Sequence, residues 1–153
     1  MPYVDWSDEF SVGLEEIDAQ HHILVDCLNR LHDAVHERKS ESEIVSVLGN
    51  LGDYTRIHFA VEEALMRVFD YKDYGPHKAE HEKLLAQFAE KAEKCQSGKV
   101  SANLELLQFL RSWLTDHIIH GDKKYAPMFL SRGMKAAATG ERQRKGWFSR
   151  LWH

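Results

Sequence analysis

The sequence has no run of 18 apolar residues, which is about the shortest helix that crosses a membrane. Its first ten residues, MPYVDWSDEF, lack the basic start and the apolar stretch of a secretory signal, so we expect a cytoplasmic protein. Proline and glycine are scarce, with three and nine residues among 153. No segment sustains the alternation of apolar and polar residues that is typical of strands. These absences argue against a membrane-spanning or collagen-like chain and favour helices.

Cysteine is also nearly absent. Cys27 and Cys95 are the two cysteines and lie 68 positions apart. This number and spacing fit neither a disulfide framework nor a metal knuckle, so both are expected to be free thiols in a reducing compartment. Apolar residues make up 43% of the chain and charged residues 29%. That balance is typical of a folded globular domain and excludes a disordered chain.

The net charge of −4 combines an acidic body with a basic end. Residues 1–132 carry a net charge of −8, and residues 133–153 carry +4. Because binding to nucleic acid needs a basic surface, the acidic body argues against a nucleic-acid partner. The same division predicts a folded domain over 1–132 and a basic, aromatic tail over 133–153.

Four segments place apolar residues three and four positions apart, as one face of an amphipathic helix does. They cover about residues 18–38, 42–69, 76–95 and 101–121, and the last is expected to resume to about residue 130 beyond a kink at Pro127. Because the connections are short, successive helices should be antiparallel neighbours. The sequence therefore predicts an all-α fold, an up-down-up-down four-helix bundle with an irregular amino-terminal arm and a short basic carboxy-terminal tail.

Local signals mark two helix starts and the course of the arm. Pro76 suits the first position of the third helix, and Ser40 would form a capping box with the glutamate three residues later. Residues 1–17 form the irregular arm, which Trp6 and Phe10 are expected to pin to the bundle. The candidate caps of the second and third helices are Ser40, Ser42, Asp73 and Gly75.

Histidine is abundant, with ten residues, about three times its ordinary usage. Every predicted helix points at least one imidazole toward the core. A separation of four residues turns a helix by about 400°, so His58 with Glu62, and His77 with His81, can each reach one point. Seven candidate metal ligands lie on the inward faces: His21, His58, Glu62, His77, His81, His117 and Asp122.

His21 and His22 cannot both face inward, because neighbouring residues of a helix point about 100° apart. His21 keeps step with Leu24 on the apolar face and is assigned to the core. His32 and His36 are four residues apart and could hold a stray metal ion, but a solvated or structural role is favoured. The histidines outside the inward set are His22, His32, His36, His120 and His153.

Five imidazoles and two carboxylates in one bundle core would each cost several kcal/mol if they had no partner. A metal centre satisfies them together. Seven ligands exceed one tetrahedral zinc ion and suit two octahedral ions, and the mixture of nitrogen and oxygen favours iron.

The step from His117 to Asp122 does not fit an α-helix. Five residues turn an α-helix by about 500°, which leaves Asp122 some 140° away from the direction of His117. Both side chains reach one centre only if the helix is irregular between them, where Gly121 lies. The sequence therefore predicts a wide turn or π-bulge over residues 117–122.

These motifs resemble the hemerythrin family, and in particular its single-domain bacterial members, over about residues 5–132. The matching stretches are Asp18-Ala-Gln-His21, His58-Phe-Ala-Val-Glu62-Glu, His77-Lys-Ala-Glu-His81 and His117-Ile-Ile-His-Gly-Asp122. Four separate motifs in order are a far more specific signal than any single HxxxH.

The resemblance implies a non-haem diiron centre in a left-handed four-helix bundle. It assigns His77, His81 and His117 to one iron, and His21 and His58 to the other. Both irons (Fe2+/Fe3+) would share the two carboxylates and a solvent-derived oxo or hydroxo bridge, and the iron with two histidines would keep a position open for dioxygen. The resemblance also implies an apolar oxygen pocket, whose matching residues are Leu24, Phe59, Trp113, Leu114 and Ile118.

The ligand set favours reversible binding of dioxygen over its use as an oxidant. Ferritin-like diiron enzymes have paired Glu-x-x-His motifs and more carboxylates, and this sequence has no Glu-x-x-His. We therefore expect an oxygen carrier, store or delivery protein and not an enzyme. The alternatives are a diiron enzyme with peroxidase, oxidase or nitric-oxide chemistry, for which Tyr54 is the one hint of a proton donor, and an oxygen or iron sensor.

The basic tail lies beyond the stretch of resemblance. Cations beside aromatic residues can bind an anionic membrane surface or an acidic partner such as an oxygen-consuming enzyme, and they can also pack on the acidic body. The protein itself is expected to be a monomer. The residues that give the tail this character are Arg142, Arg144, Lys145, Trp147, Phe148, Arg150, Leu151 and Trp152.

Overall fold

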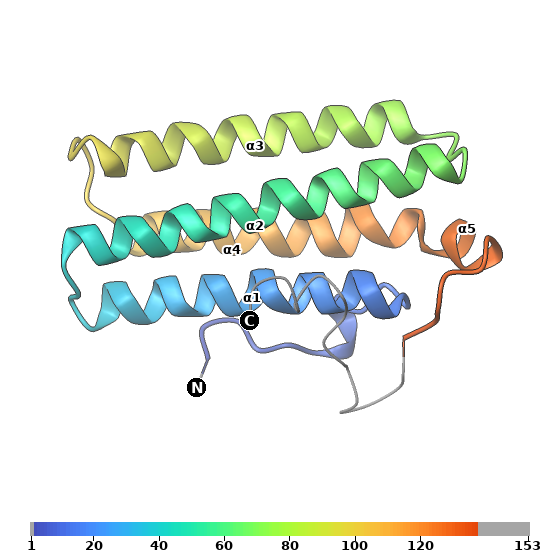
Figure 1. Cartoon of the computed structure of the whole chain (residues 1–153). Coiled ribbons are helices and arrows are strands. Elements are labelled where there is room, and N and C mark those ends of the chain that lie inside the picture. Colours follow the sequence, from blue (N-terminus) through green and yellow to red (C-terminus); the bar gives the residue numbers. More distant parts are fainter. Residues whose placement is uncertain (1, 138–153) are drawn as a thin grey trace.

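The computed structural model describes residues 2–137 and has the predicted architecture. Four long helices run alternately in opposite directions and form an up-down-up-down bundle (Figure 1). A short fifth helix continues the last of them at one end of the bundle. The elements are η1 (Asp8–Phe10), α1 (Glu15–His36), α2 (Glu41–Val68), α3 (Tyr74–Gln96), α4 (Leu104–Asp116), η2 (His117–Gly121), η3 (Asp122–Lys124) and α5 (Ala126–Ser131).

The helix starts show which of the capping signals in the sequence predicted a helix boundary correctly. The Ser40 hydroxyl accepts a hydrogen bond from the backbone N–H of Glu43 at 3.2 Å, so the predicted cap of α2 is confirmed. Asn103 caps α4 in the same way. The position of Pro76 was predicted wrongly, because α3 begins at Tyr74 and Pro76 is its third residue. A proline fits there because the first four N–H groups of a helix have no partner within the helix.

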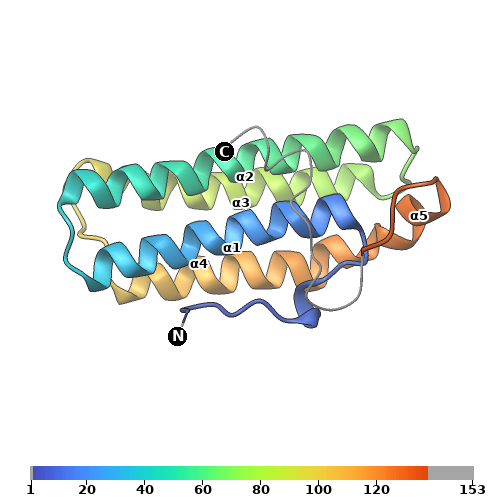
Figure 2. The ribbon, with the colours of Figure 1, turned by 60° about the horizontal axis from the view of Figure 1, so that its bottom comes forward.

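The amino-terminal arm runs along the bundle beside α1 in Figure 1 and beside α4 in Figure 2, and it contacts both helices. The side chain of Asn29 exchanges two hydrogen bonds with the backbone of Val4, at 2.7 and 2.9 Å. As predicted, Trp6 and Phe10 pin the arm: the Trp6 ring stacks on His22 with centroids 3.6 Å apart, and Phe10 is buried.

The beginning of the predicted tail also lies against the arm. Leu14 and Ala136 form an isolated antiparallel bridge, and the N–H of Glu15 donates to the carbonyl of Lys135 at 3.1 Å. The Lys135 ammonium lies 3.0 Å from the Glu15 carboxylate. The cationic and aromatic residues between 142 and 152 lie outside the described residues.

Gly52 of α2 lies where the Phe88 ring of α3 packs closest. A Cβ added there would lie 2.7 Å from Cε1 of Phe88, whereas one added at Gly49 would meet nothing within 4 Å. We expect Gly52→Ala to lower the free energy of unfolding by about 1 kcal/mol, because overpacking by ~1–3 kcal/mol outweighs a helix-propensity gain of ~1 kcal/mol. Gly49→Ala should raise it by about 0.5–1 kcal/mol. Urea unfolding measures both, and a stabilised Gly52→Ala would contradict the close packing.

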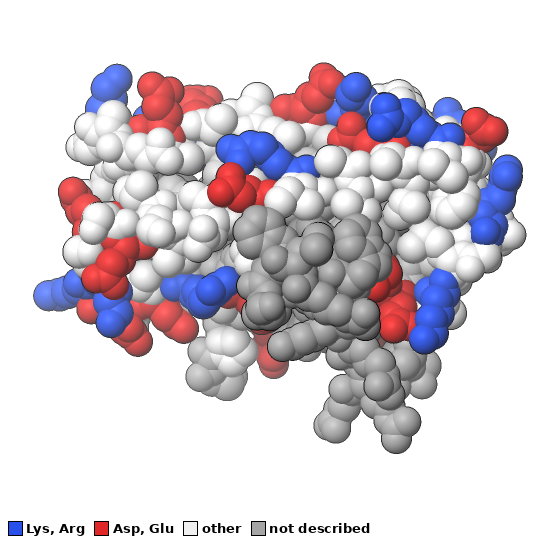
Figure 3. All heavy atoms as spheres, in the orientation of Figure 1, with Lys and Arg blue, Asp and Glu red and all other residues white. Residues whose placement is uncertain are grey.

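Among residues 2–137, no helix is long and apolar enough to span a bilayer. Cys27 is buried, Cys95 is half-buried, and both are free thiols as predicted. On the face shown in Figure 3, lysine and arginine side chains are interspersed with acidic ones and do not gather in one patch.

Candidate metal centre

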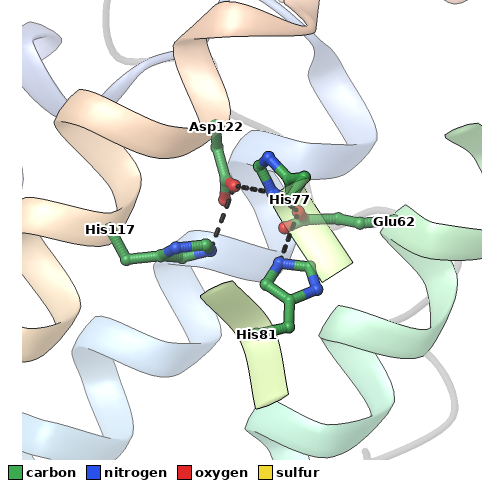
Figure 4. Close-up of side chains that lie close together, drawn as sticks. All are labelled: Glu62, His77, His81, His117 and Asp122. Carbon is green, nitrogen blue, oxygen red and sulfur yellow. Dashed lines mark ion pairs between the residues drawn. The ribbon is translucent and has the colours of Figure 1, made fainter. Parts of the chain in front are cut away.

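Helices α1, α2 and α3 and the segment after α4 bring all seven candidate ligands together in the interior of the bundle. Five of the seven are drawn in Figure 4, where they point toward one another from α2, α3 and the turn after α4. One group of ligand atoms comes from Glu62, His77, His81, His117 and Asp122. A second group comes from His21, His58, Glu62 and Asp122, and within each group the ligand atoms lie within 4.8 Å of one another.

Glu62 and Asp122 belong to both groups and lie between them. Oδ1 of Asp122 is 3.0 Å from Nε2 of His117, while Oδ2 is 2.8 Å from Nε2 of His21. In the same way, Oε2 of Glu62 faces His77 at 3.4 Å, and Oε1 contacts Nε2 of His58. Each carboxylate thus turns one oxygen to each group, which is the geometry of a ligand that bridges two ions.

The predicted irregularity after His117 is confirmed as a π-helical turn over His117–Gly121. The N–H of Asp122 donates to the carbonyl of His117, five residues earlier. This wider turn brings Asp122 back to the side of His117, as an α-helix would not. Gly121 leaves room for the imidazole, since a Cβ there would lie 3.2 Å from Nδ1 of His117.

Most of the ligand atoms have no hydrogen-bond partner, as expected of groups that bind a metal. Both oxygens of Glu62, Oδ1 of Asp122 and the Nε2 atoms of His77, His81 and His117 are buried and make no hydrogen bond. The remaining ligand atoms do meet: Nε2 of His21 lies within hydrogen-bond distance of Nε2 of His58 and of Oδ2 of Asp122, at 3.1 and 2.8 Å. Buried polar groups left without partners are costly, so five imidazoles and two carboxylates arranged in this way fit a metal cofactor.

The buried carboxylates and imidazoles of the cluster shift one another's pKa values. Burial disfavours the charged forms, but the carboxylates raise the pKa of His58 and of His77 to about 9, and the pKa of His21 is also raised. Against the same burial, the imidazoles hold the pKa values of Glu62 and Asp122 well below their ordinary range. Protons therefore occupy this cluster in the absence of an ion, and a bound metal displaces them.

Two ligands are oriented by residues that sequence reasoning missed. Nδ1 of His81 donates to Oε2 of Glu63 at 2.8 Å, and Nδ1 of His58 donates to Oε1 of Gln20 at 2.6 Å, the tautomers being those that leave Nε2 free for a metal. Both residues adjoin a ligand in the sequence, and that adjacency was the one available signal. Tyr125 was also missed; it is fully buried, and its ring lies 5.6 Å from that of His77.

Substitution of Glu63 tests whether its hydrogen bond with His81 strengthens metal binding. We expect Glu63→Ala to weaken metal binding about 10- to 100-fold, because His81 loses the acceptor that fixes its ring. Glu63→Gln keeps an acceptor and should lose much less. Competition with a chromophoric chelator measures both affinities, and equal affinities for Glu63→Ala and the unmodified chain would show that Glu63 plays no such part.

The structure distinguishes His21 from the remaining histidines. His21 is fully buried in the cluster, whereas His22 stacks on Trp6. His32 stacks between Tyr3 and His36, with ring centroids 4.5 and 5.8 Å apart, and neither His32 nor His36 joins a metal-ligand group in the described part of the chain. His120 is exposed, and His153 lies outside residues 2–137.

A narrow apolar cavity, too tight to hold a water molecule, borders the cluster. Four of the five predicted pocket residues, Leu24, Phe59, Trp113 and Leu114, line it, together with Thr55, Leu84 and His117. Ile118 is fully buried but is not among the lining residues. Apart from His117, the two polar side chains of the wall have partners: the Thr55 hydroxyl donates to the Leu51 carbonyl at 2.7 Å, and the Trp113 indole donates to the Leu84 carbonyl at 3.1 Å.

Comparisons with known proteins point to one family. A family model described as "Hemerythrin HHE cation binding domain" matches residues 12–129. A bacteriohemerythrin of Methylococcus capsulatus is 37% identical over 128 residues, which cover 83% of this chain and 97% of that relative. A bacteriohemerythrin of Pseudomonas aeruginosa is 33% identical over 150 residues, covering 98% and 95%. A crystal structure of wild-type hemerythrin is 36% identical with a TM-score of 0.78, covering 83% of this chain and 98% of that one.

Proposed function

Because the chain belongs to the hemerythrin family, we propose that it binds dioxygen reversibly at a non-haem diiron centre, as an oxygen carrier, store or delivery protein. The observation that carries the proposal is the pair of ligand groups that share Glu62 and Asp122. Two iron ions held side by side by these shared carboxylates would supply the site at which dioxygen binds. The coincidence of these groups with a buried apolar cavity supports the assignment.

The residues divide between the two ions according to the two groups. His77, His81 and His117 would hold one iron, His21 and His58 the other, and Glu62 and Asp122 would bridge them. With fewer protein ligands, the two-histidine iron is the one proposed to keep a position for dioxygen. The chain's part is to hold the imidazoles in place, through Gln20 and Glu63, before any ligand arrives.

The surroundings of the cluster favour binding over oxidation. Cleavage of an O–O bond needs a proton donor within reach. Apart from the candidate ligand His117, the cavity offers none, because its hydroxyl and indole N–H already donate to backbone carbonyls. Tyr54, the one hint of a proton donor in the sequence, does not line the cavity. Five neutral imidazoles against two carboxylates also favour the ferrous state.

An optical titration tests this function. The iron-loaded chain is reduced without oxygen, exposed to oxygen and purged with inert gas, while the charge-transfer region of the spectrum is recorded. We expect a band that appears with oxygen and disappears on purging over several cycles. One-step conversion to a stable ferric form would contradict the carrier function and favour catalysis or sensing. The zinc-loaded chain is the control, because zinc has no redox chemistry.

A further inference from the structure

The metal cluster touches solvent on one side. His77 and His117 are 9% and 7% exposed, whereas the other five ligands are at most 1% exposed. Both exposed histidines belong to the three-histidine group. The two-histidine group has no exposed member, so an ion can reach it from solvent only past the other group.

A groove of about 650 Å³ between α3 and α4 leads to these two histidines. The backbones of α3 and α4 approach each other less closely than those of the other neighbouring pairs of long helices. His77 and His117 form part of the floor of the groove, and Nδ1 of His117 is buried without a hydrogen-bond partner. The groove therefore connects solvent with the edge of the metal cluster.

The walls of the groove suit a cation. The side chains of Asp73, Glu80, Asp116 and His120 line it and are exposed, against one lysine, Lys124. Within residues 2–137, none of the three carboxylates forms an ion pair. Carboxylate oxygens and imidazole nitrogens are the ligands that divalent transition metals use, and unpaired acidic side chains in a concave surface concentrate cations.

We infer that this groove is the route by which divalent metal ions enter and leave the centre. The inference rests on the proposed metal-binding function and adds an order of events. An ion drawn in by the acidic walls is first held by the three-histidine group. Glu62 and Asp122, which belong to both groups, then pass it to His21 and His58, and a second ion fills the position left behind.

The groove does not favour the entry of dioxygen. The lining carboxylates exert no attraction on a neutral apolar molecule, and the apolar cavity is separated from the groove by Leu84, Trp113 and His117, which line both. Changes of charge in the groove should therefore alter the rate of metal uptake and leave the rate of oxygen binding unchanged.

A plug in the groove gives the sharpest test, because it can be applied to the loaded protein. Ser112 lines the groove from α4 and is exposed. In Ser112→Trp, release of Co2+ to an excess of chelator and its uptake by the metal-free chain should slow by the same factor, about 10-fold, with the final content and the affinity unchanged. The control is Glu82→Trp, since Glu82 is exposed on α3 and does not line the groove.

Charge gives an independent test. The double variant Glu80→Gln/Asp116→Asn should take up Co2+ about 10-fold more slowly at low ionic strength, and the difference should vanish in molar salt, where the Debye length is about 3 Å. Glu82→Gln/Glu93→Gln, with the same change of charge at exposed positions of α3 outside the groove, should load at the rate of the unmodified chain.

The outcomes separate the route from the function. Unchanged release and uptake in Ser112→Trp, or equal slowing by Glu80→Gln/Asp116→Asn and Glu82→Gln/Glu93→Gln, would overturn the route while the metal content stayed at two ions. Failure of the unmodified chain to take up any Co2+ would overturn the metal-binding function and the route together.

Discussion

Removal of the metal from the loaded chain is expected to lower its Tm by about 20 °C. An ion present at a thousand times its Kd stabilises the native state by about 4 kcal/mol, so two ions add about 8 kcal/mol. In a domain of this size, 1 kcal/mol shifts Tm by about 2–4 °C. The metal-free chain must also keep two carboxylates, Glu62 and Asp122, fully buried among imidazoles.

The effect of pH on this difference follows from the pKa shifts. Glu62 and Asp122 have lowered pKa values in the folded chain. Their contribution to stability is therefore present above about pH 4.5 and is lost as the pH falls further, through the lowered pKa values. His58 and His77 have pKa values raised from 6.5 to about 9, so their contribution is complete below pH 6.5 and is lost as the pH rises through about 9. The metal-free chain should therefore be most stable between about pH 4.5 and 6.5.

Metal binding becomes stronger as the pH rises from 6 to 9, because each imidazole must lose its proton to bind. The difference in Tm between the loaded and metal-free chains should thus widen from pH 6 to pH 9. Calorimetry of both forms at several pH values measures it, with denaturant unfolding as a check where heating is irreversible. A constant difference across this range would show that the buried histidines do not exchange protons for metal.

The seven cluster residues could be predicted from the sequence because ligands and core residues share the same faces of the helices. His21 keeps the register of Leu24, and His77 keeps that of His81, so apolar periodicity located the imidazoles together with the core. Asp122 was located for the opposite reason: its spacing from His117 violates the α-helical period, and a π-helical turn resolves the conflict.

The residues that support the ligands escaped prediction because they lie off those faces. Glu63 points about 100° away from Glu62, and its partner His81 comes from a different helix, so the contact depends on how α2 and α3 are rotated against each other. Helix α1 starts at Glu15, earlier than predicted, and the N–H of Glu15 donates to the carbonyl of Lys135, near the other end of the chain. Periodicity carries no information on such contacts.

The sequence pattern also did not predict which side of the cluster is exposed to solvent. His77 and His81 occupy equivalent places in the pattern, four residues apart on one face, yet His77 is 9% exposed and His81 is 1% exposed. The difference arises from the wide separation of α3 and α4, which is a property of packing between helices.

Asp122→Asn is expected to reduce the metal content from about two ions per chain to fewer than one, because both ligand groups lose the same anionic bridge. His81→Ala removes a ligand from the three-histidine group alone and should leave about one ion, held by His21, His58 and the two carboxylates. The contrast between a shared and an unshared ligand is what elemental analysis after gel filtration would measure.

Two neighbouring histidines supply the controls for that contrast. His22 stacks on Trp6 and His120 is exposed, and neither belongs to the cluster, so His22→Ala and His120→Ala should each retain two ions. Circular dichroism at the helical bands shows whether each variant is folded, with the metal-free chain as the reference for a bundle without ions. If Asp122→Asn still held two ions, Asp122 would not bridge them, and the π-helical turn that brings it to the cluster would need another explanation. If His22→Ala lost metal and His21→Ala retained two ions, the register assigned to α1 would be wrong by one residue.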